Sequence, residues 1–131
     1  MNKILALLAA ALALGGLPAL AADPLADITV AANAVPGFAG FSAERGARFF
    51  RTPGGSWSCS TCHSDDPRRA GRHAVTGKPI EPMAPAVNPR RLTDPARVEK
   101  WFRRNCKDVL SRECTAQEKG DVITYLRSMG R

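Results

Sequence analysis

Two cysteines and a histidine stand close together in the segment Cys59-Ser60-Thr61-Cys62-His63. Two thiols separated by two residues, with a histidine directly after the second thiol, form the pattern by which polypeptides attach haem c. The thiols add across the two vinyl groups of the porphyrin, and the histidine then binds the iron from one face. The motif therefore predicts one covalently attached haem c, held by Cys59 and Cys62, with His63 as an axial ligand.

Two other uses of closely spaced cysteines fit this sequence less well. A thiol–disulfide oxidoreductase motif belongs beside a β-α-β pattern, which the sequence does not show. A four-cysteine zinc site usually takes its ligands as close pairs, whereas Cys106 and Cys114 are separated by seven residues. Haem attachment is the chemistry that the spacing favours.

The start of the chain is typical of an export signal. A short cationic start at residues 1–3 precedes an apolar run from Ile4 to Leu17, and Ala19-Leu20-Ala21 supplies the small residues that a signal peptidase needs. The apolar run is shorter than the roughly 20 residues that cross a bilayer. The sequence therefore predicts a cleaved signal peptide at 1–21 and a periplasmic cytochrome c domain at 22–131, with no membrane span after cleavage.

The two remaining cysteines, Cys106 and Cys114, are expected to pair because an exported domain meets an oxidising compartment. Closing this loop of nine residues restricts the unfolded chain, which stabilises the fold by about 2–3 kcal/mol in the entropic model. The bridge either simply links two helices or also controls how the neighbouring residue Asn105 moves.

Length and composition indicate one small domain. The chain has 131 residues, of which 44% are hydrophobic and only 6% aromatic. A domain of this size commonly needs a disulfide, a metal or a cofactor to reach useful stability. All eight aromatic residues lie between Phe38 and Tyr125, which places the core there. Residues 22–40 are expected to form a loosely structured lead-in.

Three helices are predicted, and no stretch alternates as a strand would. Ser42 caps the first, which runs over Ala43–Arg51. The second begins at Asp94-Pro95, an N-cap followed by proline. The third opens at Thr115 with a capping box and ends before Gly130. These elements make the fold class all-α.

The second helix and the connection before it carry the remaining clues. Val98, Phe102, Asn105 and Val109 form one stripe along that helix, and the amide in this apolar row needs a partner. The connection from Cys59 to Thr93 is long for so small a domain, which indicates that it wraps around the haem.

The residues alone leave the second axial ligand open. Met83, His73 and Asn105 are candidates, and the position could also have no protein ligand. A methionine would raise the reduction potential, and a second histidine would give a low-potential electron carrier. The alternative role of Asn105 is a helix cap or a hydrogen bond to the backbone. Met129 falls in the last turn of a helix and is interpreted as packing.

Four segments of the chain resemble the sphaeroides haem protein family and the cytochromes c double-prime. These segments are Cys59–His63, Thr76–Pro85, Trp101–Cys106 and Cys114–Lys119. The likeness spans roughly Ser42 to Leu126. Its most specific element is an asparagine directly before the first of two cysteines that are seven residues apart.

The resemblance implies a small monohaem variant of the class I cytochrome c fold. It implies that Asn105 is the second axial ligand, that it leaves the iron on reduction, and that the Cys106–Cys114 disulfide lies beside it. Gly46 and Phe50 would meet the last helix near Tyr125. Met83 matches a loop that does not normally supply an axial ligand in the family.

The predicted function follows from the donor set. An amide oxygen is a hard donor that prefers ferric iron, so reduction should open a coordination position for O2, NO or CO. We therefore expect periplasmic electron transfer with gas binding, and the resemblance implies reduction by a dihaem or membrane-bound cytochrome. The alternatives are a small haem enzyme that reduces nitric oxide or oxygen species, and a plain electron carrier with Met83 or His73 as permanent ligand.

The charge balance of the chain is basic, with 19 Lys and Arg against 12 Asp and Glu. A nucleic-acid function is disfavoured because the chain is predicted to be exported and shows no recognised binding module. Some arginines are expected to pair with haem propionates and the rest to attract an acidic redox partner. A solvated surface without a partner is the alternative. The arginines concerned are Arg45, Arg48, Arg51, Arg68, Arg69, Arg72, Arg90, Arg91, Arg103 and Arg104.

Overall fold

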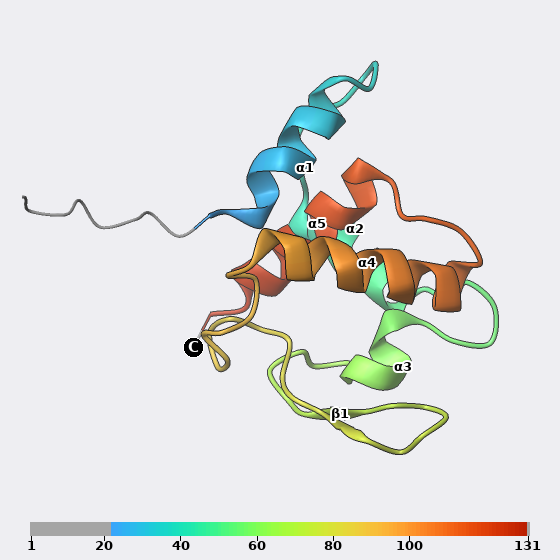
Figure 1. Ribbon diagram of the computed structural model, residues 1–131. Helices are drawn as coiled ribbons and strands as arrows, with labels where there is room; N and C mark the ends of the chain where they lie inside the picture. Colours follow the sequence, from blue (N-terminus) through green and yellow to red (C-terminus); the bar gives the residue numbers. More distant parts are fainter. Residues whose placement is uncertain (1–21, 131) are drawn as a thin grey trace, which may run out of the picture.

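The structure is a computed structural model that describes residues 22–130, and helices dominate this range (Figure 1). The helices are α1 (Pro24–Asn33), α2 (Ala43–Arg51), α3 (Cys59–His63), α4 (Pro95–Leu110) and α5 (Ala116–Ser128), and the strands are β1 (Gly71–Arg72) and β2 (Pro79–Ile80). The predicted all-α class is confirmed. Within residues 22–130 no helix combines the length and hydropathy that a membrane crossing requires. The predicted signal peptide at 1–21 lies outside the described residues.

The predicted helix starts are confirmed by their caps. Ser42, Asp94 and Thr115 each accept a hydrogen bond from a backbone N–H in the first turn of the following helix. Glu118 completes the capping box at Thr115 by accepting from its backbone N–H. These caps satisfy N–H groups that the helices leave unpaired, which fixes where each helix begins.

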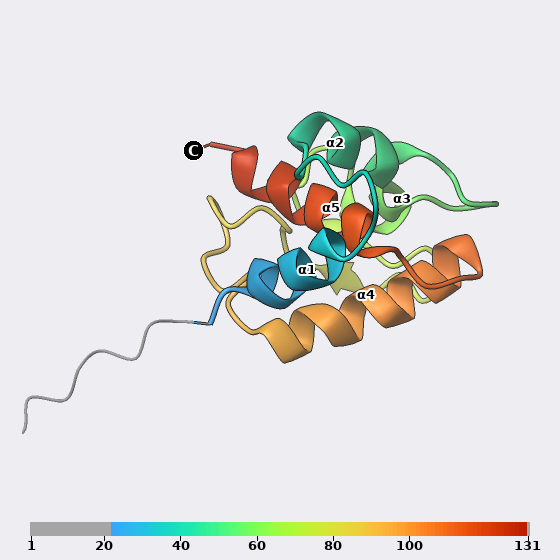
Figure 2. The same ribbon diagram turned by 90° about the horizontal axis from the view of Figure 1, so that it is seen from above.

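The core lies between α2 and α5, which run side by side (Figure 2). Gly46 allows the close approach, because a Cβ there would come within 2.0 Å of the backbone oxygen of Asp121. One turn later the buried Phe50 ring packs on Tyr125, with ring centroids 5.8 Å apart. The meeting of Gly46 and Phe50 with the last helix is therefore confirmed.

Helix α4 crosses in front of α2 and α5 (Figure 1) and contacts their core cluster through the partly buried Phe102. Its main helix contact is with α1. The predicted stripe of Val98, Phe102, Asn105 and Val109 is half-buried, whereas the residues on the other side of α4 are exposed. The inward face of α4 is therefore sheltered without being closely covered by another helix.

The prediction of a loosely structured lead-in at 22–40 was wrong, because α1 occupies its first half. Asp23 caps this helix and forms an ion pair with Arg127 of α5 at 2.8 Å. Ile28 and Ala32, one turn apart, are buried. The apolar side of α1 is stabilised by α4 and α5, which the chain supplies only later in the sequence.

The long connection is more ordered than predicted, and the expectation of no strand was wrong. Strands β1 and β2 form an antiparallel hairpin in which Gly71 pairs with Ile80 and Arg72 with Pro79. Two-residue strands are too short to give an alternating pattern. Helix α3 also lies in this connection, at its start.

Candidate functional site

The predicted haem-attachment segment forms one short helix, α3, with a capping box at its start. Ser58 Oγ accepts a hydrogen bond from the Thr61 backbone N–H at 3.2 Å, and Thr61 Oγ1 accepts from the Ser58 N–H at 3.0 Å. Cys62 and His63 follow Cys59 by three and four residues. The helical turn therefore places both on the same side of α3 as Cys59. Both cysteines are free thiols.

The β1–β2 hairpin packs directly on this helix. A Cβ at Gly71 would lie 1.9 Å from the backbone oxygen of Cys62 and 2.9 Å from the Cα of His63, so only glycine fits there without a shift. The Ala74 N–H donates to the Cys62 sulfur at 3.3 Å. Sequence reasoning missed this support, because one glycine in a loop carries no signal of what approaches it.

His63 lies against the core. Its ring centroid is 6.3 Å from that of Phe50. Burial lowers the pKa of His63 to about 4, and the positive charge of Arg91 acts in the same direction. The imidazole is therefore neutral at neutral pH, which is the form that binds metals. Burial also raises the pKa of the Cys59 thiol to about 11.

Asn105 lies inside α4 and is not a cap, since Asp94 and Ser111 hold the cap positions. Among residues 22–130, the side-chain hydrogen bonds of this helix are accepted by Asp94 from the Arg97 N–H and by Glu99 from Lys119, and Asn105 makes none. Neither of the alternative roles predicted for this amide, a helix cap or a hydrogen bond to the backbone, is therefore seen in the described part of the chain. Its carboxamide is half-buried and available to another partner.

A disulfide joins Cys106, directly after Asn105, to Cys114, as the sequence predicted. The two Cα atoms are 5.6 Å apart, and both residues are buried. Because Cys114 directly precedes Thr115, the cap of α5, the bridge ties α4 to the start of α5. The disulfide therefore restrains the part of α4 that contains Asn105.

The other ligand candidates have different surroundings. His73 lies on the hairpin that packs on α3, and its Nδ1 accepts hydrogen bonds from the N–H groups of Val75 and Thr76, each at 3.2 Å. Met83 is half-buried against the core. Met129 packs against the same cluster, as predicted.

The residues around α3 fit a haem c. Within the described residues 22–130, His63 Nδ1 is buried and has no hydrogen-bond partner, which is costly for a polar atom. Free thiols lie beside this imidazole, and the inward face of α4 is only half-covered. Partly buried Leu92, Phe102 and Met83 add apolar surface near the core. A porphyrin whose iron is bound by one nitrogen of His63 would cover these apolar side chains.

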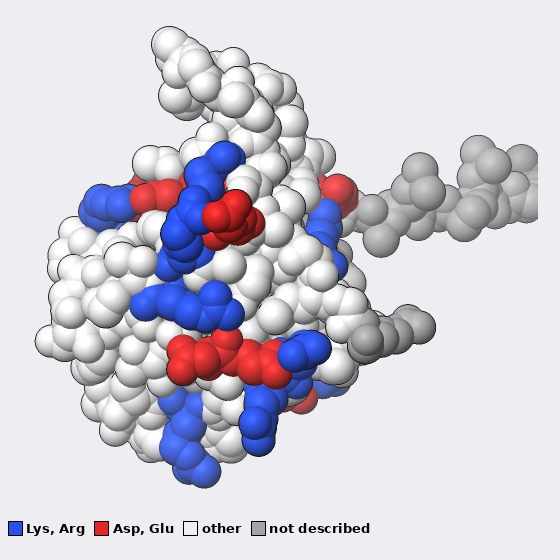
Figure 3. Space-filling view, turned by 180° about the vertical axis from the view of Figure 1, so that it is seen from behind, with Lys and Arg blue, Asp and Glu red and all other residues white. Residues whose placement is uncertain are grey.

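The arginines of α2 do not form a free basic surface, which corrects one expectation. Arg45 pairs with the buried Asp121 at 2.8 Å, Arg48 pairs with Glu44, and Arg51 donates to the Tyr125 hydroxyl at 2.7 Å. On the face shown in Figure 3, basic and acidic side chains lie next to one another. These contacts are structural.

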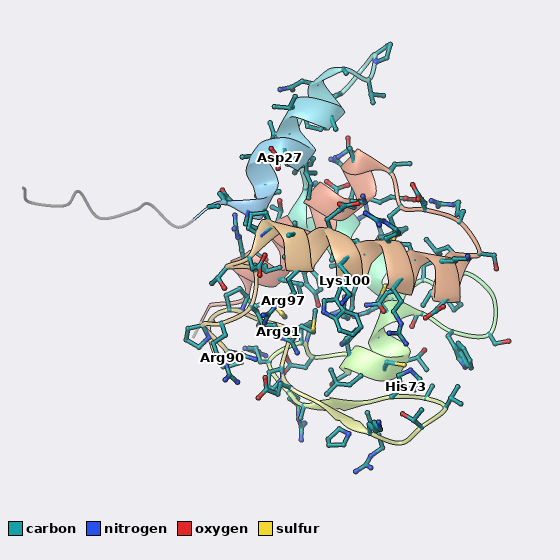
Figure 4. The ribbon with its side chains drawn as sticks, in the orientation of Figure 1. Asp27, His73, Arg90, Arg91, Arg97 and Lys100 are labelled. Carbon is teal, nitrogen blue, oxygen red and sulfur yellow. A yellow bond between two sulfur atoms is a disulfide. The ribbon has the colours of Figure 1, made fainter. Side chains whose placement is uncertain are left out.

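A second group of cations gathers near the start of α4. Figure 4 shows Arg90, Arg91, Arg97 and Lys100 there, on the loop and the first turns of the helix. Arg91 is half-buried and donates to the backbone oxygens of residues 81 and 82 at 2.8 and 3.0 Å. Arg91 therefore fixes the loop that carries Met83.

Comparison with known proteins places these features in a family. The family described as a domain of unknown function, DUF1924, matches residues 36–126. Cytochrome c-type protein SHP of Cereibacter sphaeroides is 46% identical over 114 residues, which cover 83% of this chain and 88% of that protein.

Two solved structures share the fold. The structure of oxidised SHP, an oxygen-binding cytochrome c, has 43% identity and a TM-score of 0.70, covering 81% of this chain and 94% of that chain. The solution structure of Methylophilus methylotrophus cytochrome c'', reported for haem-ligand detachment, has 35% identity and a TM-score of 0.68, covering 82% and 92%. The chain therefore belongs to the DUF1924 family and to the group of monohaem c-type cytochromes that includes SHP and cytochrome c'', whose cofactor is one covalently attached haem c.

Proposed function

We propose that this protein is a periplasmic electron-transfer cytochrome whose sixth ligand is released on reduction. Cys59 and Cys62 hold the haem, His63 is the permanent axial ligand, and Asn105 is the ligand that leaves. Haem supplies one-electron redox chemistry, and its ferrous iron binds O2 or NO where an axial position is open. The observation that carries this proposal is the half-buried carboxamide of Asn105, which makes no hydrogen bond within residues 22–130 and lies beside the Cys106–Cys114 disulfide.

The two ligands differ in donor chemistry. The neutral imidazole of His63 offers a nitrogen lone pair that suits iron in both oxidation states. The carboxamide oxygen of Asn105 is a hard, neutral and weak donor that favours ferric over ferrous iron. Reduction therefore weakens the bond made by Asn105 more than the bond made by His63.

The surroundings of the alternative ligands argue against a permanent sixth ligand. His73 belongs to the hairpin that packs on α3, so it lies on the side of His63, whereas a sixth ligand must come from the opposite face. Its Nδ1 already accepts two backbone hydrogen bonds. Met83 packs against the core. Asn105 comes from a separate helix.

The charges near the start of α4 support an acidic redox partner. Lys100 is exposed and makes no ion pair within residues 22–130, whereas the exposed Arg90 and Arg97 pair with Glu81 and Asp94. Opposite charge on a partner speeds association at low salt. A dihaem or membrane-bound cytochrome with an acidic docking face is the electron donor that we propose.

Absorption spectra of the haem-loaded protein test the proposal. In Asn105→Ala the ferric spectrum changes, because the sixth ligand is gone, while the ferrous spectrum and the ferrous response to carbon monoxide match the parent. Asp108→Ala, an exposed change on the same helix, is the control and keeps both spectra. An Asn105→Ala protein with the parent ferric spectrum, or a ferrous parent that does not respond to carbon monoxide, would overturn the assignment.

A further inference from the structure

The loop between α2 and α3 contacts the last turn of α4 at a glycine. A Cβ at Gly54 would lie 2.5 Å from the backbone oxygen of Val109 and 2.4 Å from Cδ2 of Leu110. The φ angle of Gly54 is outside the left-handed region, so the backbone itself would accept alanine. Glycine is needed here because the last turn of α4 occupies the space of a side chain.

This loop also leads directly into the haem-binding helix. The Gly54 N–H donates to the Trp57 carbonyl at 3.0 Å, a hydrogen bond that joins the two ends of this short segment. The next residue, Ser58, is the cap of α3 and precedes Cys59. The loop is therefore attached to α4 at one end and to the haem-attachment motif at the other.

The last turn of α4 is adjacent to Asn105. Val109 is one helical turn after Asn105 and belongs to the same half-buried stripe. Cys106 attaches the same part of α4 to Cys114. The part of α4 from Asn105 to its last turn is therefore attached at two points, the disulfide at Cys106 and the contact with Gly54.

We propose that Gly54 is a positioning residue for Asn105. The missing side chain lets the last turn of α4 lie close to the loop, in the position from which the carboxamide reaches the iron. A side chain at position 54 would push this turn away by several tenths of an ångström or more, and the oxygen of Asn105 would lose its fit to the ferric iron. This inference rests on the proposed function, because it assumes that Asn105 is the sixth ligand.

The test measures how tightly the ferric, haem-loaded protein binds azide, followed by absorption. Azide must displace Asn105, so its apparent affinity rises when the Asn105-bound state is destabilised. Overpacking by one methyl group predicts a rise of roughly fivefold to a hundredfold for Gly54→Ala.

Two control variants separate position from general destabilisation. Gly55→Ala places its methyl group where nothing lies within 4 Å, so azide affinity stays at the parent value. Gly46→Ala crowds the backbone of Asp121 at the α2–α5 contact, so it destabilises the fold without a change in azide affinity. Equal effects of Gly46→Ala and Gly54→Ala, or a Gly54→Ala protein that binds azide as the parent does, would overturn the inference.

The same assay distinguishes this inference from the proposed function. If Asn105→Ala leaves azide affinity unchanged, the ligand assignment itself fails. If Asn105→Ala raises the affinity, adding Gly54→Ala to it should change nothing further, because no carboxamide remains to be positioned. A further rise in the double variant contradicts an action through Asn105.

A second variant covers the case in which Gly54→Ala does not fold. Leu110→Ala removes the side chain that lies over Gly54 and loosens the same contact from the other side. We expect a smaller rise in azide affinity. An unchanged affinity in a folded Leu110→Ala protein contradicts the proposed role of the contact.

Discussion

The two sides of the candidate haem site are built differently. His63 belongs to a helix that is capped at Ser58 and covered by the hairpin at Gly71, and its ring lies against Phe50 of the core. Asn105 belongs to α4, which reaches the α2–α5 core through Phe102 but does not run alongside either helix as α2 and α5 do with each other. Its helix is held by the disulfide, by the ion pair of Glu99 with Lys119 and by the loop at Gly54.

This difference suggests how one ligand can stay while the other moves. A side chain surrounded by close backbone contacts has one position, because dense packing resists displacement. A side chain on a helix attached at a few points can move without disturbing the core. Permanent ligation therefore fits the His63 side, and release fits the Asn105 side. The following predictions test this contrast.

The largest effect is expected on the His63 side. His63→Ala removes the proposed permanent ligand, so the haem-loaded protein should lose the parent spectra in both oxidation states. His73→Ala is the control. It loosens the turn at Val75 and Thr76 but keeps both spectra, since His73 is not a proposed ligand. Retention of the ferrous spectrum in His63→Ala would contradict the assignment.

The next effect is expected from the disulfide. The double variant Cys106→Ala, Cys114→Ala should lower the free energy of unfolding by about 2–3 kcal/mol, because the closed loop of nine residues no longer restricts the unfolded chain. Denaturant unfolding followed by circular dichroism measures this loss. Azide affinity of the ferric protein should rise as well, because α4 loses an attachment next to Asn105. If the double variant is less stable than the parent but binds azide equally well, the bridge does not position Asn105.

Gly71→Ala probes the packed side. The methyl group would meet the backbone of Cys62 and His63, so we expect a loss of about 1–3 kcal/mol in the free energy of unfolding from overpacking. Gly55→Ala, in open space, is the matched control. Azide affinity should change less in Gly71→Ala than in Gly54→Ala, because the crowding lies on the His63 side. A larger change in azide affinity for Gly71→Ala than for Gly54→Ala would contradict the contrast between the two sides.

Much of the fold could be predicted because its signals are local. The caps at Ser42, Asp94 and Thr115 and the stripe on α4 follow from short-range rules, and the structure confirms them. The same signals were present at α1, where Asp23-Pro24 repeats the Asp-Pro pattern of residues 94–95 and Ile28 and Ala32 lie one turn apart. That helix was missed because its amphipathic pattern is weak.

The site was predicted less completely than the fold. The spacing of Cys59, Cys62 and His63 predicts the attachment motif, since covalent chemistry fixes that spacing. The supports at Gly54 and Gly71 could not be predicted, because each depends on a backbone segment that approaches from far along the chain. A sequence shows a glycine but not the neighbour that requires it.

The smallest effect concerns acid and the ion pair beside the disulfide. Hydrogen bonds from Arg112, together with the N–H of Thr115, hold the pKa of Glu118 below its usual value. A carboxyl whose pKa is lowered by folding contributes stability that is present above pH 4.5, its ordinary pKa, and is lost as pH falls through the lower folded value. Glu118→Gln should therefore be slightly less stable than the parent at neutral pH, and the two should converge in acid.

Acid unfolding curves of the parent, Glu118→Gln and the exposed control Glu113→Gln measure this difference. Glu118 completes the capping box at the start of α5, next to Cys114. The loss of stability in acid therefore lies on the Asn105 side of the site. Azide affinity of the parent should therefore rise below pH 4.5 more than that of Glu118→Gln, after correction for protonation of azide itself. Parallel curves for the parent and Glu118→Gln would mean that the attachment of α4 through α5 does not depend on this charge.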